Sequence, residues 1–488
     1  MTAAVVVLPI LAPMLGAVLA LLLRGHRAQR AVWLAAHAAH LVAAAGLLST
    51  VLAEGIAVTR MGAWPAPFGI AFVADRLAAL LVMVTAVVGA AVGCYAALSP
   101  RPAPTLAPLM LMLLTGVCGA FVAGDLFNLY VWFEVLLISS FVLLAHEGRP
   151  APLAGALRYV AINLVSSALF LTALGLLYAK AGTLDLADLA RLAASDREGA
   201  LGGVAVLLMV AFGIKAGVFP LFGWLPPAYP TPAPVVSALF AGLLTKVGVY
   251  ALMRVFTLVF VHDTGFTHGL LLMAGALTMG IGVLGAASRA GIRRILSFHI
   301  ISQIGYIVVG LALYTPFAIG ASVFYLVHHI VVKTALFLVG GLVAEAGGSE
   351  ELSRLGGLRR VWPALWLVFA IPALSLAGMP PLSGFFAKVG IIRAAFDAGA
   401  PGVGALALGV GLLTLFSMLK IAHAAFLGPA ADEARPPRPV GRARLWPVAA
   451  LAAISVAVGL LAGPVFEVCL AAGEALFERS EYLQAGAR

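Results

Sequence analysis

Long apolar segments recur along nearly the whole chain, and this recurrence restricts it to one class of fold. A membrane-spanning helix needs about 20 mostly apolar residues, which is the length of each segment. With 63% hydrophobic and 10% charged residues, the chain also lacks the polar side chains that a water-soluble globule of 488 residues needs at its surface. We therefore predict an all-α polytopic membrane protein.

The apolar segments predict fourteen transmembrane helices, two of them interrupted by glycine and proline. The predicted spans are 3–23, 31–53, 77–98, 105–124, 126–145, 157–179, 201–225 (broken), 232–259, 268–287, 292–314, 317–345, 364–396 (broken), 402–427 and 445–471. The first break is predicted at Pro220 and Pro226, and the second at Gly378, Pro380 and Pro381.

Interrupted spans at corresponding positions of two halves are typical of inverted-repeat transporters. We therefore predict two inverted five-helix repeats, at 105–259 and 260–427. Three helices precede them in 1–104, and an arginine-rich link, the last helix and a tail follow in 428–488.

The basic residues are distributed unequally between the two ends of the predicted helices. Alternate loops, beginning with 24–30, carry sixteen arginines, whereas the opposite loops carry nine basic residues. Cytoplasmic loops are enriched in Lys and Arg. This predicts a multi-pass protein of the cytoplasmic (inner) membrane with both termini outside. The net charge of +10 follows from this excess, so it indicates attraction to anionic membrane lipids and not to nucleic acid.

One carboxylate and several lysines interrupt the apolar segments. Glu134 lies near the middle of 121–145, where an ionisable residue is costly and indicates function. The buried lysines form a set of five: Lys215, Lys246, Lys333, Lys388 and Lys420. Buried lysine, unlike arginine, can exchange a proton near neutral pH, so such a set is suited to a proton path. The alternative, that lysines near span ends extend to the headgroups, is strongest for Lys420.

Histidines lie among these lysines. One span places His299, Ser302, Gln303 and Tyr306 on one helical face, and another places Tyr325, His329 and Lys333 at successive four-residue steps, with His328 adjacent. Histidine is a ready proton carrier, although hydrogen bonding between helices is an alternative role for His299 and His329. We expect His37 and His40, in the second span, to be structural.

Motifs for other chemistries are absent or misplaced. Gly280, Gly282 and Gly285 match a dinucleotide fingerprint, but they lie inside a predicted span, where close helix packing explains them better. The three cysteines are far apart, and there is no CxxC pair, HExxH motif or Walker loop. We therefore expect no cofactor and no metal.

Five segments together resemble the antiporter-like membrane subunits shared by respiratory complex I, membrane-bound hydrogenases and Mrp antiporters. They are 124–144, 213–252, 293–306, 328–341 and 375–390. Within that superfamily, GDLFNLYVWFEVLLISS and HHIVVKTALFLVGG most resemble the D-type subunits of the Mrp-type multisubunit Na+/H+ antiporters.

The resemblance implies roles for particular residues. Glu134 and Lys215 would form a switchable ion pair, and a proton would pass from Lys215 to Lys246 and onward to Lys388. His329 and Lys333 match the intervening histidine and lysine, with His328 as the alternative histidine. The protein would work with other membrane subunits and exchange protons for Na+ or another monovalent cation.

Two alternatives to the antiporter stay open at this point. In the first alternative, the chain is the proton-pumping subunit of a redox-driven complex that is related to complex I or to a membrane-bound hydrogenase. The second alternative, a membrane scaffold, is disfavoured because five lysines against one deep acid is an imbalance that helix packing alone does not require.

Overall fold

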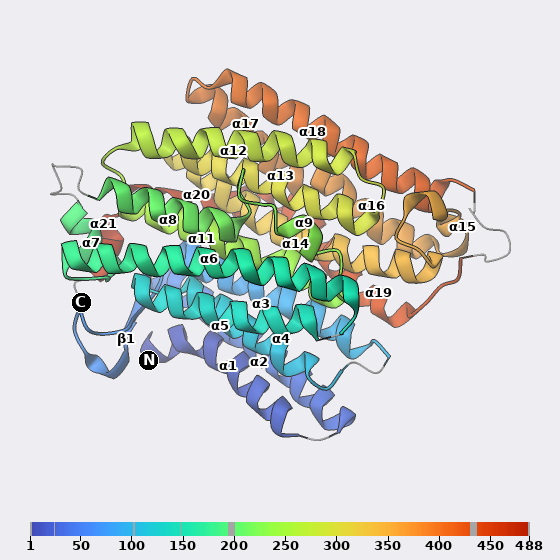
Figure 1. Cartoon of the computed structure of the whole chain (residues 1–488), viewed down its shortest axis with the longest axis horizontal. Helices are drawn as coiled ribbons and strands as arrows, with labels where there is room; N and C mark the ends of the chain where they lie inside the picture. Colours follow the sequence, from blue (N-terminus) through green and yellow to red (C-terminus); the bar gives the residue numbers. More distant parts are fainter. Residues whose placement is uncertain are drawn as a thin grey trace.

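The computed structural model describes residues 2–23, 25–100, 103–146, 148–193, 201–429 and 437–486. Figure 1 shows helices running along one common direction, with the two marked chain ends at the same end of the molecule. An even number of membrane crossings gives this arrangement. Part of the arginine-rich link and five of the arginines counted for orientation lie outside the described residues: Arg24, Arg101, Arg197, Arg435 and Arg488.

The N-terminal region contains three long helices and one small hairpin. The helices are α1 (Thr2–Leu22), α2 (His26–Glu54) and α3 (Arg76–Ala97). Between α2 and α3, strands β1 (Ala57–Arg60) and β2 (Ala71–Ala74) pair in antiparallel fashion, with Ala57 opposite Ala74, around the short helix η1 (Met61–Ala63). The hairpin departs from the all-helical expectation, because its strands have only four residues each and the segment between them, 61–70, contains two glycines and two prolines.

The first predicted repeat begins with two neighbouring helices and a third that starts earlier than predicted. It comprises α4 (Leu106–Phe121), α5 (Leu126–Ala145), α6 (Pro150–Ala181), α7 (Leu186–Ala193), α8 (Gly202–Ala216), α9 (Leu225–Ala228), α10 (Pro234–Leu239), the π-helical turn η2 (Phe240–Leu244) and α11 (Thr245–Leu258). Proline at the first helical position starts α6 at Pro150 and not at 157.

The second predicted repeat and the C-terminal region follow. They comprise α12 (Thr264–Ala287), α13 (Ile292–Ala312), α14 (Pro316–Gly347), η3 (Leu352–Arg354), α15 (Leu358–Val361), α16 (Pro363–Ala377), α17 (Ser383–Asp397), α18 (Pro401–Ile421), η4 (Ala422–Leu427), η5 (Arg442–Arg444), α19 (Leu445–Leu460), α20 (Ala462–Glu478) and α21 (Ser480–Ala485). The prediction of one helix over 445–471 was wrong, because the helix is interrupted at Leu461, just before Gly463 and Pro464.

The polytopic helical membrane fold is confirmed. Among the described residues, 11 helices are long and apolar enough to cross a membrane, and three shorter apolar helices accompany them: Leu106–Phe121, Gly202–Ala216 and Pro363–Ala377. The number of crossings and the domain boundaries stay predictions. The most apolar windows of α14 and of the Pro234–Leu258 segment are completely enclosed by other helices, so these two elements form the centre of the bundle.

Both predicted helix breaks are present, and they share a local pattern. Helix α8 ends at Gly217 (φ 75°) and α16 ends at Gly378 (φ 92°), in the left-handed conformation that glycine adopts readily. A proline follows each glycine after three residues, at Pro220 and Pro381. Pro226 lies beyond the first break, within α9, and Pro380 lies within the second break.

The backbone around the first break retains hydrogen-bond partners. The Phe219 amide donates to the Thr278 hydroxyl at 2.8 Å, and the Trp224 indole donates to the carbonyl of Ile214 at 2.8 Å. Irregular backbone at membrane depth requires such partners.

Two of the three glycines of the apparent dinucleotide motif, Gly282 and Gly285, allow close helix packing, as predicted. A Cβ at Gly282 would lie 2.4 Å from the amide nitrogen of Ser302, and one at Gly285 would lie 2.3 Å from the Phe298 ring. These glycines therefore allow α12 to approach α13 closely.

Candidate functional site

Four of the five predicted lysines lie inside the helix bundle. Lys246 and Lys333 are completely buried, and Lys215 and Lys388 are only 4% and 5% exposed. They come from α8, α11, α14 and α17, of which α11 and α14 belong to the enclosed centre. A lysine in such surroundings needs a polar partner or must give up its charge.

Lys215 and Glu134 meet through a third residue, Ser167 of α6. The Ser167 hydroxyl donates to Glu134 Oε1 at 2.6 Å, and Lys215 Nζ donates to the same hydroxyl oxygen at 3.2 Å. Lys215 Nζ also lies 4.8 Å from the centre of the Phe133 ring. Glu134 is only partly buried. The predicted acid–lysine pair is thus brought together, with a serine as its bridge.

Lys215 occupies the last turn of α8, directly before the break at Gly217. Helix α11 crosses this point closely, because a Cβ at Gly248 would lie 2.5 Å from the amide nitrogen of Ala216. Lys246 lies two residues before Gly248 and donates its ammonium to the Ala241 carbonyl across the π-helical turn η2. The break that follows Lys215 and the π turn that precedes Lys246 therefore lie near the close approach of α8 and α11.

The candidate site is a row of ionisable residues: Glu134, Lys215, Lys246, His329, Lys333, His299 and Lys388. Helices α14 and α13 carry its central part. His329 lies close enough to Lys246, Lys333 and His299 to experience their charges. Lys333 donates to the carbonyl of Leu296 at 3.1 Å. Among the residues that the structure describes, the buried ring nitrogens of His329 and of His299 have no hydrogen-bond partner. Such unsatisfied polar atoms in an enclosed site are costly, and they are suited to contact with transient water or a mobile proton.

The far end of the row lies at the second helix break. Lys388 Nζ donates to the carbonyl of Ala377, the last residue of α16, at 3.0 Å, and it lies 5.4 Å from the centre of the Tyr306 ring. Lys388 therefore reaches back across the break from α17. The charge of Lys388 also acts on His299 and on His328, so Lys388 lies beside the central part of the row.

His328, the alternative histidine, faces a cluster of three serines. Its Nδ1 lies 2.8 Å from the Ser383 hydroxyl, and this hydroxyl lies 3.1 Å from those of Ser375 and Ser455. These serines belong to α17, α16 and α19. His328 thus points toward the second break, whereas His329 lies beside Lys246 and Lys333.

The other polar residues of α13 have separate partners. Ser302 donates to the Met279 carbonyl of α12, and Tyr306 donates to the Ala407 carbonyl of α18 at 2.5 Å. Gln303 accepts a hydrogen bond of 2.5 Å from Tyr325. Ser302 therefore serves helix packing, while the ring of Tyr306 borders Lys388.

Lys420 lies apart from the other lysines. It is half-buried and donates to the carbonyls of Ala287 and Arg289, at 3.1 Å and 2.6 Å, where α12 ends. A cation at a helix C-terminus interacts favourably with the helix dipole. This geometry favours the alternative of a lysine at the rim.

Sequence reasoning missed the serines of the site. Ser167 lies in a predicted span, within the doublet Ser166–Ser167, but serine is common in transmembrane helices and no spacing linked it to Glu134. Ser375, Ser383 and Ser455 are far apart in the chain, so their clustering depends on tertiary packing.

The arrangement contains donors and acceptors of protons but no ligand set for a metal. Among the residues that the structure describes, no group of three or more His, Cys, Asp or Glu side chains is placed to hold a metal ion. These side chains are suited to proton exchange, because each lysine or histidine can release or take up a proton.

Known proteins resemble this chain over nearly its full length. The family described as NADH:quinone oxidoreductase/Mrp antiporter, transmembrane, matches residues 123–414. The D-type Na(+)/H(+) antiporter subunit of Alkalihalophilus pseudofirmus is 44% identical over 485 residues, 98% of each chain, and that of Bacillus subtilis is 40% identical over 485 residues with the same coverage.

Solved structures show the same fold. A chain of the Mrp complex from Dietzia sp. matches with a TM-score of 0.92 and 34% identity, covering 99% of both chains. A chain of respiratory complex I from Thermus thermophilus matches with a TM-score of 0.85 and 26% identity, covering 98% of this chain and 99% of that one. These comparisons confirm the resemblance seen in the sequence motifs. The chain therefore belongs to the NADH:quinone oxidoreductase/Mrp antiporter family of transmembrane proteins, and it is a transporter subunit and not an enzyme.

Proposed function

We propose that this chain is the proton-translocating subunit of a multisubunit Na+/H+ antiporter and conducts protons along the row of Glu134, lysines and histidines. The observation that carries the proposal is the Ser167 hydroxyl, which contacts both Glu134 and Lys215. A shared hydroxyl keeps an acid and a base close without fixing them in direct contact, so a small helix movement can join or separate their charges.

The first step takes place at this Glu134–Ser167–Lys215 site. An ionised carboxylate stabilises a nearby ammonium group, and in this proposal Glu134 acts on Lys215 in that way while the two are close. When the pair separates, Lys215 loses this support in an apolar environment and releases its proton toward Lys246. The break at Gly217 ends α8 beside Lys215 and gives the helix end freedom to move.

The following steps use the enclosed centre of the bundle. Lys246 passes the proton to His329, and Lys333 and His299 connect His329 with Lys388 at the second break. Two protonated neighbours repel each other, so a proton arriving at one end of the row drives one out at the other. His328 and its serine cluster stand beside the exit, and Lys420 lies outside the path.

The protein works as part of a hetero-oligomer in the cell membrane. The curated relatives are called antiporter subunits, and the structural relative is called a complex. The partial burial of Glu134 and the exposed apolar side chains of α5, among them Phe127 and Ile138, leave a surface for lipid or a neighbouring subunit. The excess of arginine in alternate loops supports an orientation with both termini outside.

The alternative of a redox-driven proton pump uses the same path. It is supported by the fold shared with complex I and with the membrane-bound sulfane sulfur reductase, an archaeal respiratory complex, at 26% identity in each case. The identities of 40% and 44% with the curated Na(+)/H(+) antiporter relatives favour the antiporter.

The test is Na+-dependent proton flux in everted membrane vesicles that carry the complete gene cluster. We expect Glu134→Ala and Lys215→Gln to abolish the pH change that follows Na+ addition, while the complex still assembles. Lys420→Gln makes the same substitution at the rim and should retain flux. Full flux in assembled Lys215→Gln complexes would refute the proposal, and proton pumping driven by electron transfer without any Na+ response would select the alternative.

A further inference from the structure

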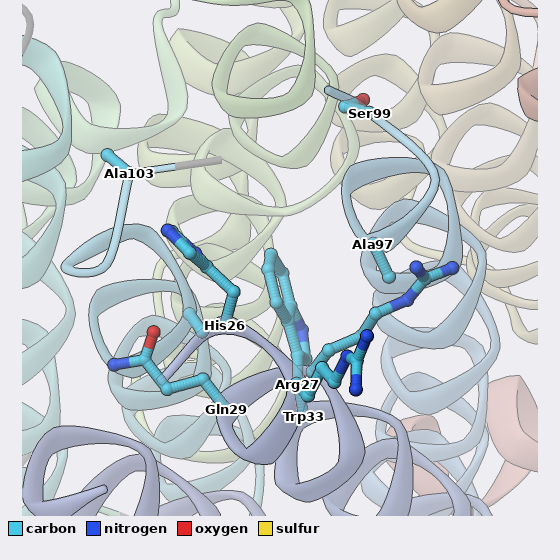
Figure 2. Close-up of a pocket in the computed structure, with 9 residues that line it drawn as sticks. His26, Arg27, Gln29, Trp33, Ala97, Ser99 and Ala103 are labelled. Atoms are coloured by element: carbon cyan, nitrogen blue, oxygen red, sulfur yellow. The ribbon is translucent and has the colours of Figure 1, made fainter. Parts of the chain in front are cut away.

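A pocket of about 270 Å³ lies at the end of the bundle where α2 begins. It is lined by His26, Arg27, Arg30 and Trp33 from α2. Residues that follow α3 in the chain, among them Ser99 and Ala103, also line it. Figure 2 shows the His26 and Trp33 side chains reaching into the space between α2 and these residues. The pocket belongs to neither the proton row nor the helix breaks.

The lining is strongly positive. Arg27 and Arg30 are positively charged, and neither forms an ion pair with a described carboxylate. None of the lining residues that the structure describes is acidic. The free amide groups of the first turn of α2 add partial positive charge, and Gly25, the residue before the helix, has no side chain with which to cap them. The pocket is therefore suited to an anion.

Exposed apolar side chains lie close in the sequence to the pocket residues, and Gln29 of the lining donates to the carbonyl of Ala20, one residue before Leu21. Leu21 and Leu22, at the end of α1, are 68% and 70% exposed, and Leu34 of α2 is 38% exposed. Trp33 is buried and donates its indole N–H to His37 at 2.7 Å, which fixes the ring at the inner wall. Tryptophan and basic residues at the end of a transmembrane helix are typical of the level of the lipid headgroups.

We propose that this pocket binds the headgroup phosphate of an anionic phospholipid in the leaflet that the arginine-rich loops face. The phosphate lies between Arg27, Arg30 and the start of α2, and the acyl chains lie along Leu21, Leu22 and Leu34. Free phosphate would match the charge alone, whereas a phospholipid matches both the charge and these exposed apolar side chains. The site is independent of the proton path.

The experiment measures lipid binding to the intact purified complex by native mass spectrometry during titration with phosphatidylglycerol, with phosphatidylcholine as the neutral comparison. We expect Arg27→Gln/Arg30→Gln to weaken the tightest phosphatidylglycerol site roughly 25-fold, because each basic residue near an anionic headgroup contributes about a factor of five. Arg27→Lys/Arg30→Lys should retain most of the binding, which separates loss of charge from misfolding.

The matched control is Arg359→Gln/Arg360→Gln, which removes two exposed arginines at α15, on the same side of the predicted topology. Phosphatidylglycerol binding should not change in this variant, and excess inorganic phosphate should leave the lipid in place. Unchanged phosphatidylglycerol binding in Arg27→Gln/Arg30→Gln would overturn the proposal. So would displacement of the lipid by phosphate, which indicates a free-anion site, or loss of a partner subunit with lipid binding intact, which indicates a protein contact.

Discussion

Replacing Ser167 with alanine tests whether its hydroxyl supports proton transfer at the Glu134–Ser167–Lys215 site. The substitution removes one hydroxyl, which is 2.6 Å from Glu134 Oε1 and 3.2 Å from Lys215 Nζ. A hydrogen bond to a charged group contributes about 1.5–3 kcal/mol. If the bridge supports the transfer step, its loss raises the barrier by a similar amount and lowers flux roughly 10- to 100-fold.

The assay is initial-rate proton flux after Na+ addition in everted vesicles, normalised to the amount of assembled complex. Ser167→Thr keeps a hydroxyl and should retain most of the flux. Ser166→Ala is the matched control, because Ser166 is buried one residue away and donates at 2.7 Å to the Ala211 carbonyl, outside the pair. It should leave the flux close to that of the unaltered chain.

Two results would refute this reasoning. Flux in Ser167→Ala within about twofold of the unaltered chain would show that the serine does not take part in the transfer step. Equal losses in Ser166→Ala and Ser167→Ala would show that both act through helix packing.

Three further predictions concern other parts of the molecule. Lys388→Gln should lower flux roughly 100-fold, the scale of losing a proton-transfer group, without loss of assembled complex on native gels; normal flux would remove Lys388 from the path. Gly282→Val should reduce the amount of folded protein, because its Cβ would meet Ser302 backbone at 2.4 Å, whereas Gly269→Val on the same helix meets nothing within 4 Å and should be tolerated; equal yields would contradict this. Burial raises the pKa of Asp125, outside the spans, from 3.8 to about 6, so stability present below pH 3.8 is lost as pH rises through about 6. The protection factors of the β1–β2 hairpin amides, which are the intrinsic exchange rates at each pH divided by the observed rates, should therefore be lower at pH 7 than at pH 5, and Asp125→Asn should remove that difference; an unchanged pH dependence of the protection factors in the variant would exclude Asp125.

The class of fold and most helix positions could be predicted from the sequence, because apolar length and charge bias are local properties of the chain. The break at Leu461 was not predicted, since Gly463 and Pro464 interrupt an apolar run whose average composition stays that of a span. The β1–β2 hairpin was missed for another reason, because its two four-residue strands flank the glycine- and proline-containing segment 61–70, which carries no periodic pattern.

In the candidate site, the charged residues could be predicted from the sequence, whereas the residues that matter only through their contacts could not. Glu134 and the buried lysines interrupt apolar segments, so each one is visible alone. Ser167 and the Ser375–Ser383–Ser455 cluster acquire meaning only through neighbours on other helices. Lys420 is the opposite case, because its charge drew attention to it but its contacts do not support a place in the row. It lies inside a predicted span, and with α12 and α18 packed together it donates to backbone carbonyls at the end of α12.

The measurement that tests the proton path most directly uses Lys246, which lies between the Glu134–Ser167–Lys215 site and the histidine-containing centre of the row. The purified complex, with and without Lys246→Gln, is reconstituted into liposomes, and proton flux driven by a Na+ gradient is measured together with ²²Na+ uptake driven by a pH gradient. The proposed path predicts that both fluxes are lost in the assembled variant, because protons from Lys215 then have no next carrier. Coupled fluxes that persist at the normal rate in Lys246→Gln would contradict it.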